Sequence, residues 1–123
     1  SDAMMWRLLG WRLFCMSIRL DKKWVSKDDA LLLLRGNLGV YQLADATQQI
    51  RFIGYAGGKS LFGLKGEIQA AFQDHPTAVF VRWEVTSAYM SRYRELLMLH
   101  LHDHDVLPPE NNPIPLGKLR PAG

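Results

Sequence analysis

The stretch LGVYQLADATQQIRFIGYAGG, residues 38–58, carries the clearest structural pattern in the chain. Two runs rich in apolar, β-branched and aromatic residues, 38–44 and 50–55, flank the polar segment 45–49. Runs of this kind around a short polar connection are typical of a β-hairpin, and the Ala-Gly-Gly step at 56–58 predicts a turn. The stretch therefore predicts two antiparallel strands that lead directly into a turn.

Helical patterns lie on both sides of this hairpin. Upstream, Ser26 followed by two acidic residues predicts a helix start, and the apolar run 30–34 continues the helix until a Gly-Asn pair. Downstream, Ser60 is a candidate cap for a helix over 61–73 that ends before Pro76. The apolar stripe of this second helix consists of Leu61, Leu64, Ile68 and Phe72.

A further strand and the longest helix complete the pattern. Residues 77–85 are rich in Val, Phe and Trp, which favours a strand. Thr86 or Ser87 is the candidate cap of a helix that runs to about His102. Its predicted buried stripe consists of Tyr89, Tyr93, Leu96, Leu97 and His100.

This order of elements predicts an α+β fold, with a small antiparallel or mixed sheet of about three strands flanked by helices. We expect one domain over 21–107, followed by a proline-rich tail over 108–123. Residues 1–20 combine a tag remnant with an apolar and basic segment. That segment is open to three interpretations: a packing helix, sequence upstream of a true start at Met16, or an interfacial membrane helix.

Composition limits the classes of protein to which the chain can belong. Its 123 residues are 48% hydrophobic, which suits one domain with a core, and no apolar stretch reaches the roughly 18–20 residues that span a bilayer. The single Cys15 rules out an internal disulfide, so we expect a cytoplasmic protein. The net charge of +3 comes from residues 1–27, which carry +4, whereas residues 28–123 carry −1, so a nucleic-acid face in residues 28–123 would need local clustering of basic residues.

Several short motifs occur in a characteristic order. Gly39-Val40-Tyr41 and Phe52-Ile53-Gly54 lie on the two predicted strands, the glycine-rich step follows, and a Pro-Pro pair with asparagines occupies 108–112. In this order the motifs resemble those of the GIY-YIG nuclease superfamily. The resemblance implies a β-β-α core, a further helix in most members, and then a strand and a helix.

The resemblance also implies metal-dependent phosphodiester hydrolysis, with Mg²⁺ or Mn²⁺ stabilising charge on phosphate oxygens. On its motif Tyr41 corresponds to the first tyrosine, whereas Phe52 replaces the second and lacks its hydroxyl. Lys65 is the candidate for the helix arginine, and either Asn111 or Asn112 corresponds to the superfamily asparagine. The metal-holding glutamate is expected near His100, and Glu95, which lies more than one helical turn earlier, is the nearest glutamate.

Each candidate residue also has a structural interpretation. Gly57, Gly58 and Lys59 are candidates for binding phosphate, but the glycines also suit a turn that needs positive φ, and the lysine also suits a solvated surface. Tyr41 is equally compatible with an ordinary half-buried strand tyrosine. His100 and His104 share a helix face, which suits either a transition metal or one packed histidine at a solvated helix end.

We therefore expect a GIY-YIG-like domain, and two functions follow from the sequence. The first is a divergent metal-dependent endonuclease with an altered active site. The second is a non-catalytic module on the same fold that binds nucleic acid or protein. DNA or RNA is the expected partner, and a homodimer through Trp6, Trp11 and Phe14 is a further expectation because exposed apolar patches usually find a partner.

Overall fold

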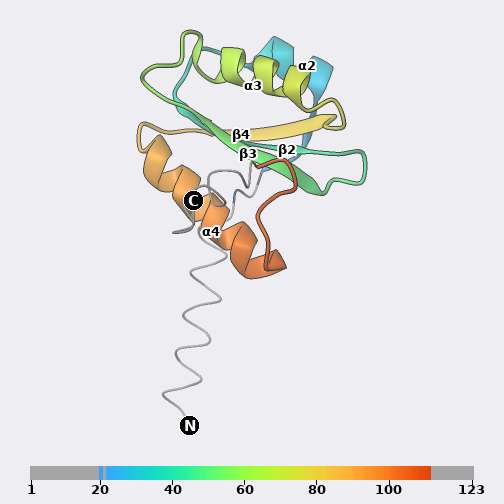
Figure 1. Ribbon diagram of the computed structural model, residues 1–123. Coiled ribbons are helices and arrows are strands. Elements are labelled where there is room, and N and C mark those ends of the chain that lie inside the picture. The colour runs from blue at the N-terminus through green and yellow to red at the C-terminus, as the bar shows by residue number, and fades with distance from the viewer. Residues whose placement is uncertain (1–19, 21, 112–123) are drawn as a thin grey trace, which may run out of the picture.

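The structure, a computed structural model, describes residue 20 and residues 22–111. A four-stranded sheet forms the middle layer, with two helices on one face and the longest helix on the other (Figure 1). This arrangement confirms the expected α+β fold. The elements are β1 (Val25–Ser26), α2 (Lys27–Leu33), β2 (Gly39–Ala44), β3 (Ile50–Ala56), α3 (Gly63–Asp74), β4 (Phe80–Val85) and α4 (Tyr89–His104).

All neighbouring strands of the sheet are antiparallel, in the order β1-β4-β2-β3. The predicted hairpin is confirmed as β2 and β3, in which Tyr41 is paired with Gly54. The two-residue strand β1, which pairs with the start of β4, was not predicted because so short a segment has no readable period. The strand β3 forms one edge of the sheet, and this position shapes the site described below.

The two faces of the sheet carry separate apolar clusters, as the alternation of side chains in a strand requires. Tyr41 and Leu43 pack toward α2 and α3, together with Leu64, Ile68 and Phe72 of α3. Val40 and Ile53 point to the opposite face, where they pack against Leu96 of α4. The central strand β2 is buried along its whole length, so its side chains contribute to both clusters.

The glycines of both hairpin tripeptides are required by close packing. A Cβ atom on Gly39 would lie 2.1 Å from the Glu84 carbonyl oxygen of β4. A Cβ atom on Gly54 would lie 2.4 Å from the hydroxyl oxygen of Tyr41. At Gly39 the close atom belongs to the backbone of β4, so the strands would have to separate, and at Gly54 the buried Tyr41 ring would have to move.

Two helix starts differ from those expected. The helix α3 begins at Gly63 rather than at residue 61, and Leu61 is 85% exposed instead of lying on the buried stripe. The Ser60 hydroxyl does not cap α3 but accepts a hydrogen bond from the Gly57 N–H, because the glycine turn bends back on itself. The α4 N-cap position is Ala88, whose N–H donates to the Thr86 hydroxyl. The cap predicted at Ser26 is confirmed by a 3.3 Å bond from the Asp29 N–H.

The segment after α4 packs against the open edge of β3. The Asn111 side chain accepts a hydrogen bond from the Ile53 N–H at 2.7 Å and donates one to the Ile53 carbonyl at 2.9 Å. The Glu110 carboxylate pairs with Arg51 and accepts a hydrogen bond from the Thr77 hydroxyl. The packed part of the chain thus extends beyond the expected boundary at residue 107 and includes the buried residues Pro108 and Asn111.

Within the described residues, no helix has both the length and the apolar character needed to cross a membrane. Trp6, Trp11, Phe14 and Asn112 lie outside the described residues, so the expectations attached to them stay predictions.

Candidate functional site

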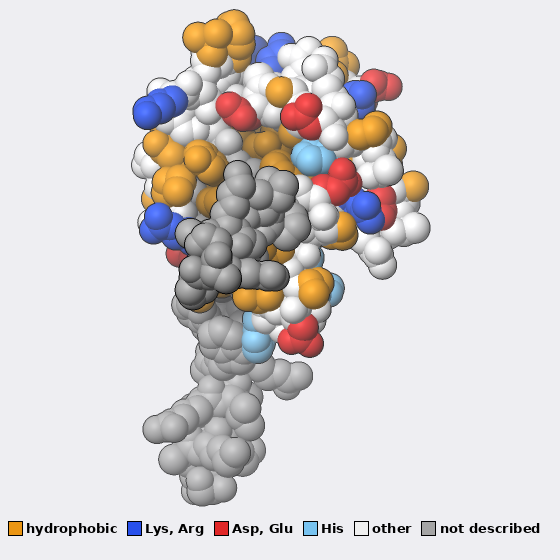
Figure 2. Space-filling model, viewed as in Figure 1, with side chains coloured by type: hydrophobic (Ala, Val, Ile, Leu, Met, Phe, Trp, Pro, Cys, Tyr) orange, Lys and Arg blue, Asp and Glu red, His pale blue; other side chains and the backbone are white. Residues whose placement is uncertain are grey.

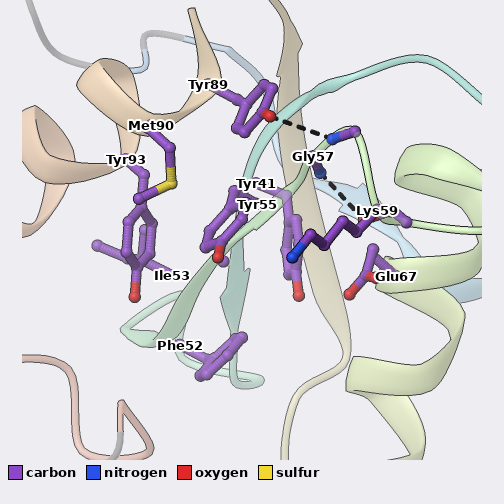
Figure 3. A pocket seen from close by; sticks show the side chains of 13 residues that line it. Tyr41, Phe52, Ile53, Tyr55, Gly57, Lys59, Glu67, Tyr89, Met90 and Tyr93 are labelled. Atoms are coloured by element: carbon purple, nitrogen blue, oxygen red, sulfur yellow. Dashed lines mark hydrogen bonds between the residues drawn. The ribbon is translucent and has the colours of Figure 1, made fainter. Parts of the chain in front are cut away.

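A pocket of about 630 Å³ lies along β3, at the edge of the sheet (Figure 3). It takes side chains from both faces of the sheet, because β3 is an edge strand and Gly54 contributes no side chain there. All four tyrosines of the chain line it. The side chains that give it its chemistry are Tyr41, Phe52, Tyr55, Lys59, Glu67, Tyr89, Met90 and Tyr93.

Tyr41 is held by the strand pairing on both of its sides. Its neighbours across the sheet are Gly54 of β3 and Trp83 of β4, and its ring lies over Gly54 with only 3% of the residue exposed. Burial first, and then the negative charge of Glu67, raise the pKa of Tyr41 far above its ordinary value of 10. The hydroxyl therefore remains protonated near neutral pH, so it can donate a hydrogen bond and is not a base.

The turn between β3 and α3 brings Lys59 to the pocket. The Gly57 N–H donates to the Ser60 hydroxyl at 3.0 Å, and the Gly58 N–H donates to the Tyr89 hydroxyl at 3.1 Å. The predicted turn is confirmed, since the Ser60 N–H donates to the Gly57 carbonyl at 3.0 Å. The expected positive φ is wrong, because it is found at neither Gly57 nor Gly58. Gly57 is required instead because a Cβ atom there would lie 2.8 Å from the Tyr89 ring.

Glu67 is a pocket residue that the sequence interpretation missed. It lies on α3 beside the buried stripe of Leu64 and Ile68, and its side chain lies near Lys59 and Tyr41 in Figure 3. Its position three residues after Leu64 was the available signal, since residues three apart share a helix face. It brings a carboxylate into the same pocket as Tyr41 and Lys59.

The far side of the pocket is a cluster of three tyrosines. The rings of Tyr55 and Tyr89 are nearly parallel, with an interplanar angle of 9° and centroids 5.8 Å apart. The Tyr93 ring is tilted by 58° against Tyr55, at 4.9 Å. Tyr55 is 38% exposed, while Tyr89 and Tyr93 of α4 are partly buried behind it. We call Tyr55, Tyr89 and Tyr93 the tyrosine wall.

Other predicted site residues lie away from this pocket. Lys65 is exposed on α3 and is not among the lining residues. Glu95 pairs with Arg92 at 3.3 Å, and His100 is 8% exposed with its Nδ1 atom 2.8 Å from the Val106 carbonyl oxygen. The structure thus brings together Tyr41, Gly57, Gly58 and Lys59 of the predicted set and places Lys65, Glu95 and His100 elsewhere.

The phosphate and metal chemistry of the pocket is limited to a few groups. Among the described residues, no group of three or more His, Cys, Asp or Glu side chains lies close enough to hold a metal ion. The pocket itself contains one carboxylate, that of Glu67. A hard cation such as Mg²⁺ accepts this ligand set only when water and phosphate oxygens complete its coordination.

Residues 18–103 match the model of a family described as Domain of unknown function (DUF7508), so the chain belongs to that family. The match spans nearly all of the described elements and stops before the segment that packs against β3. Neither the curated proteins nor the solved structures contain a match.

Proposed function

We propose that this DUF7508 member is a GIY-YIG-like domain that binds nucleic acid, with the pocket at β3 as its phosphodiester site. One observation carries the proposal. Tyr41, Lys59 and Glu67, which come from three separate segments of the chain, converge on a single pocket whose other large side chains are mostly aromatic. The first of these residues belongs to the tripeptide motif on which the superfamily resemblance rests.

Lys59 supplies the positive charge for a phosphate. Its ammonium group extends into the pocket in Figure 3, and it forms no ion pair with another described residue. A lysine acts on phosphate as a point charge, so it attracts the group without fixing its orientation. The protonated Tyr41 hydroxyl complements it, because it can donate a hydrogen bond to a phosphate oxygen.

Glu67 makes the site dependent on a cation. A carboxylate next to a phosphate is repulsive unless a positive ion lies between them. Mg²⁺ commonly uses one or two carboxylates together with phosphate oxygens and water, which fits one glutamate beside a bound phosphodiester. We therefore expect Mg²⁺ or Mn²⁺ to strengthen binding at this site.

A second candidate function is cleavage of the bound phosphodiester. Glu67 favours it, since a metal held there would stabilise charge on the phosphate oxygens. The burial of Tyr41 weighs against it, because a buried hydroxyl disfavours the tyrosinate form that would take a proton from water. Binding without cleavage is therefore the function that the pocket supports better.

The test is fluorescence anisotropy with labelled single-stranded, duplex and branched DNA and with RNA, in the presence of Mg²⁺, Mn²⁺ or EDTA. The same mixtures are run on denaturing gels to detect cleavage. Lys59→Met is compared with Lys65→Met, which removes an equal charge outside the pocket. We expect Lys59→Met to weaken binding and to reduce the slope of log affinity against log salt by about 0.7, the value for one phosphate contact on a single strand.

The outcomes separate the two functions. Binding that Lys59→Met weakens and Lys65→Met leaves unchanged, with no cleavage, supports the binding module. Metal-dependent cleavage that both Glu67→Gln and Tyr41→Phe abolish supports the nuclease. Equal losses in the two lysine variants, or no binding to any of the nucleic acids, contradict the pocket as a phosphodiester site.

A further inference from the structure

The tyrosine wall has a geometry that the phosphate chemistry of the pocket does not explain. Lys59 and Glu67 reach the pocket from the turn and from α3, whereas Tyr89 and Tyr93 come from α4 on the other face of the sheet. Tyr55 of β3 lies on the same face of the sheet as α4. Phe52 lies on the opposite face, because successive residues of a strand point to opposite faces. The pocket thus has a polar side and an aromatic side, joined across the bare backbone of Gly54.

The wall is rigid for reasons visible in its contacts. The Tyr89 hydroxyl is fixed by the Gly58 N–H at 3.1 Å, which ties α4 to the glycine turn. The Tyr93 ring packs against the buried cluster that contains Val40, Ile53 and Leu96, and the backbone polar groups of Ile53 are bound by the Asn111 side chain. Both rings therefore support Tyr55 from fixed positions, and an aromatic surface that is already ordered loses little entropy when a ligand stacks on it.

Tyr55 is the accessible member of the wall. Its residue is 38% exposed, and its hydroxyl projects toward the pocket beside Lys59 in Figure 3. Stacking on aromatic rings is the common way in which proteins bind single-stranded nucleic acid, because every base has a π-face. A pocket of about 630 Å³ is of the size that holds a small ligand, which suits a splayed nucleotide and not a stacked and paired duplex.

We propose that Tyr55, backed by Tyr89 and Tyr93, stacks an unpaired base while the adjoining phosphate lies at Lys59, so that the pocket selects single-stranded nucleic acid. This inference rests on the proposed function and adds the class of substrate to it. A base in a duplex is stacked on its neighbours and paired, so it reaches the wall only after costly unstacking. Sequence preference is weak in this arrangement, because stacking does not read base edges.

The test compares a labelled single strand with the same sequence closed into a blunt hairpin duplex, at equal salt and with Mg²⁺. Tyr55→Ala removes the stacking ring, Tyr55→Leu keeps an apolar side chain without a π-face, and Tyr55→Phe keeps the ring. Phe62→Ala is the matched control, because Phe62 is 66% exposed and lies outside the pocket. Circular dichroism melting establishes that each variant is folded.

We expect the wild type to prefer the single strand, with a loss of about 5- to 100-fold in Tyr55→Ala and Tyr55→Leu. Tyr55→Phe and Phe62→Ala should stay within about twofold of the wild type, since neither removes a ring from the wall. Equal affinity for the hairpin, or single-strand affinity that Tyr55→Ala and Tyr55→Leu leave unchanged, overturns the inference while leaving the phosphodiester site intact. A wild type that binds neither form contradicts the proposed function itself.

Discussion

The pocket at β3 and the C-terminal part of the domain use their polar groups in opposite ways. From α4 to Asn111, several polar side chains have partners within the domain. Glu95 pairs with Arg92, His100 bonds the Val106 carbonyl, and Asn111 binds the Ile53 backbone. In the pocket, Lys59 and Glu67 form no ion pair with any other residue of the described part. In the C-terminal region the polar side chains stabilise the fold, whereas in the pocket the charged side chains remain available to bind a ligand. The comparison predicts that changes in the first region lower stability and that changes in the second lower binding.

The largest expected effect is that of Asn111→Ala. This change leaves the Ile53 N–H and carbonyl without their partner, and each unsatisfied buried group costs about 1–3 kcal/mol. We expect the free energy of unfolding to fall by roughly 2–4 kcal/mol, as measured by urea denaturation. Val106→Ala in the same segment is the control and should change it by less than about 0.5 kcal/mol, because Val106 is exposed. Equal effects of the two variants would show that the segment does not hold β3.

An intermediate effect is expected from pH. Burial, with the neighbouring His104 acting in the same direction, lowers the pKa of His100 below its ordinary value of 6.5. The unfolded chain then binds a proton that the folded chain does not, so stability is complete above about pH 6.5 and falls as the pH drops below it. We expect the melting temperature to fall between pH 7 and pH 5, and to fall less in His100→Gln.

The pH range in which protonation of His100 lowers stability lies above the range in which protonation of Glu110 does so. Burial raises the pKa of Glu110, but hydrogen bonds from His75, Thr77 and Arg51 outweigh burial and lower it below its ordinary value of 4.5. The stability that Glu110 contributes is therefore lost only when the pH falls below 4.5. If the melting temperature of His100→Gln falls between pH 7 and pH 5 by the same amount as that of the wild type, His100 is not the cause of the fall.

The smallest expected effect on stability is that of Glu67→Gln. Because Glu67 has no ion-pair partner among the described residues, we expect the free energy of unfolding to change by less than about 0.5 kcal/mol. Urea denaturation at pH 7 measures the change, with the wild type as the reference. A large loss of stability in Glu67→Gln would mean that the pocket, like the C-terminal region, holds the fold.

Much of the fold was readable from local pattern. The hairpin, the strand before α4 and both long helices follow from the periodicity of apolar residues, which depends only on neighbours in the chain. The start of α3 could not be predicted in this way, because the Ser60 hydroxyl could bond either to the first turn of the helix or within the glycine turn. In the structure it accepts a hydrogen bond from the Gly57 N–H. The strand β1 was missed because its two residues become a strand only by pairing with β4.

The candidate site was readable only in part. The tripeptide motifs pointed to Tyr41, and the glycine turn pointed to Lys59, which the structure places in one pocket. The usual spacing between the motifs of the superfamily also pointed to His100 and Glu95. Both lie on α4 outside that pocket, where they contact residues of the C-terminal region. Glu67, Tyr55, Tyr89 and Tyr93 were not assigned to a site, because no spacing along the chain links a strand, a turn and two helices.

The sequence by itself determined the hairpin of β2 and β3, the strand β4 and the existence of the two long helices, because these depend on local propensity and on the periodicity of apolar residues. Only the tertiary structure decided which polar groups became partners and which remained in the pocket. The reason is that burial and hydrogen-bond satisfaction belong to groups that meet in space, and Asn111 meets Ile53 across 58 residues of chain.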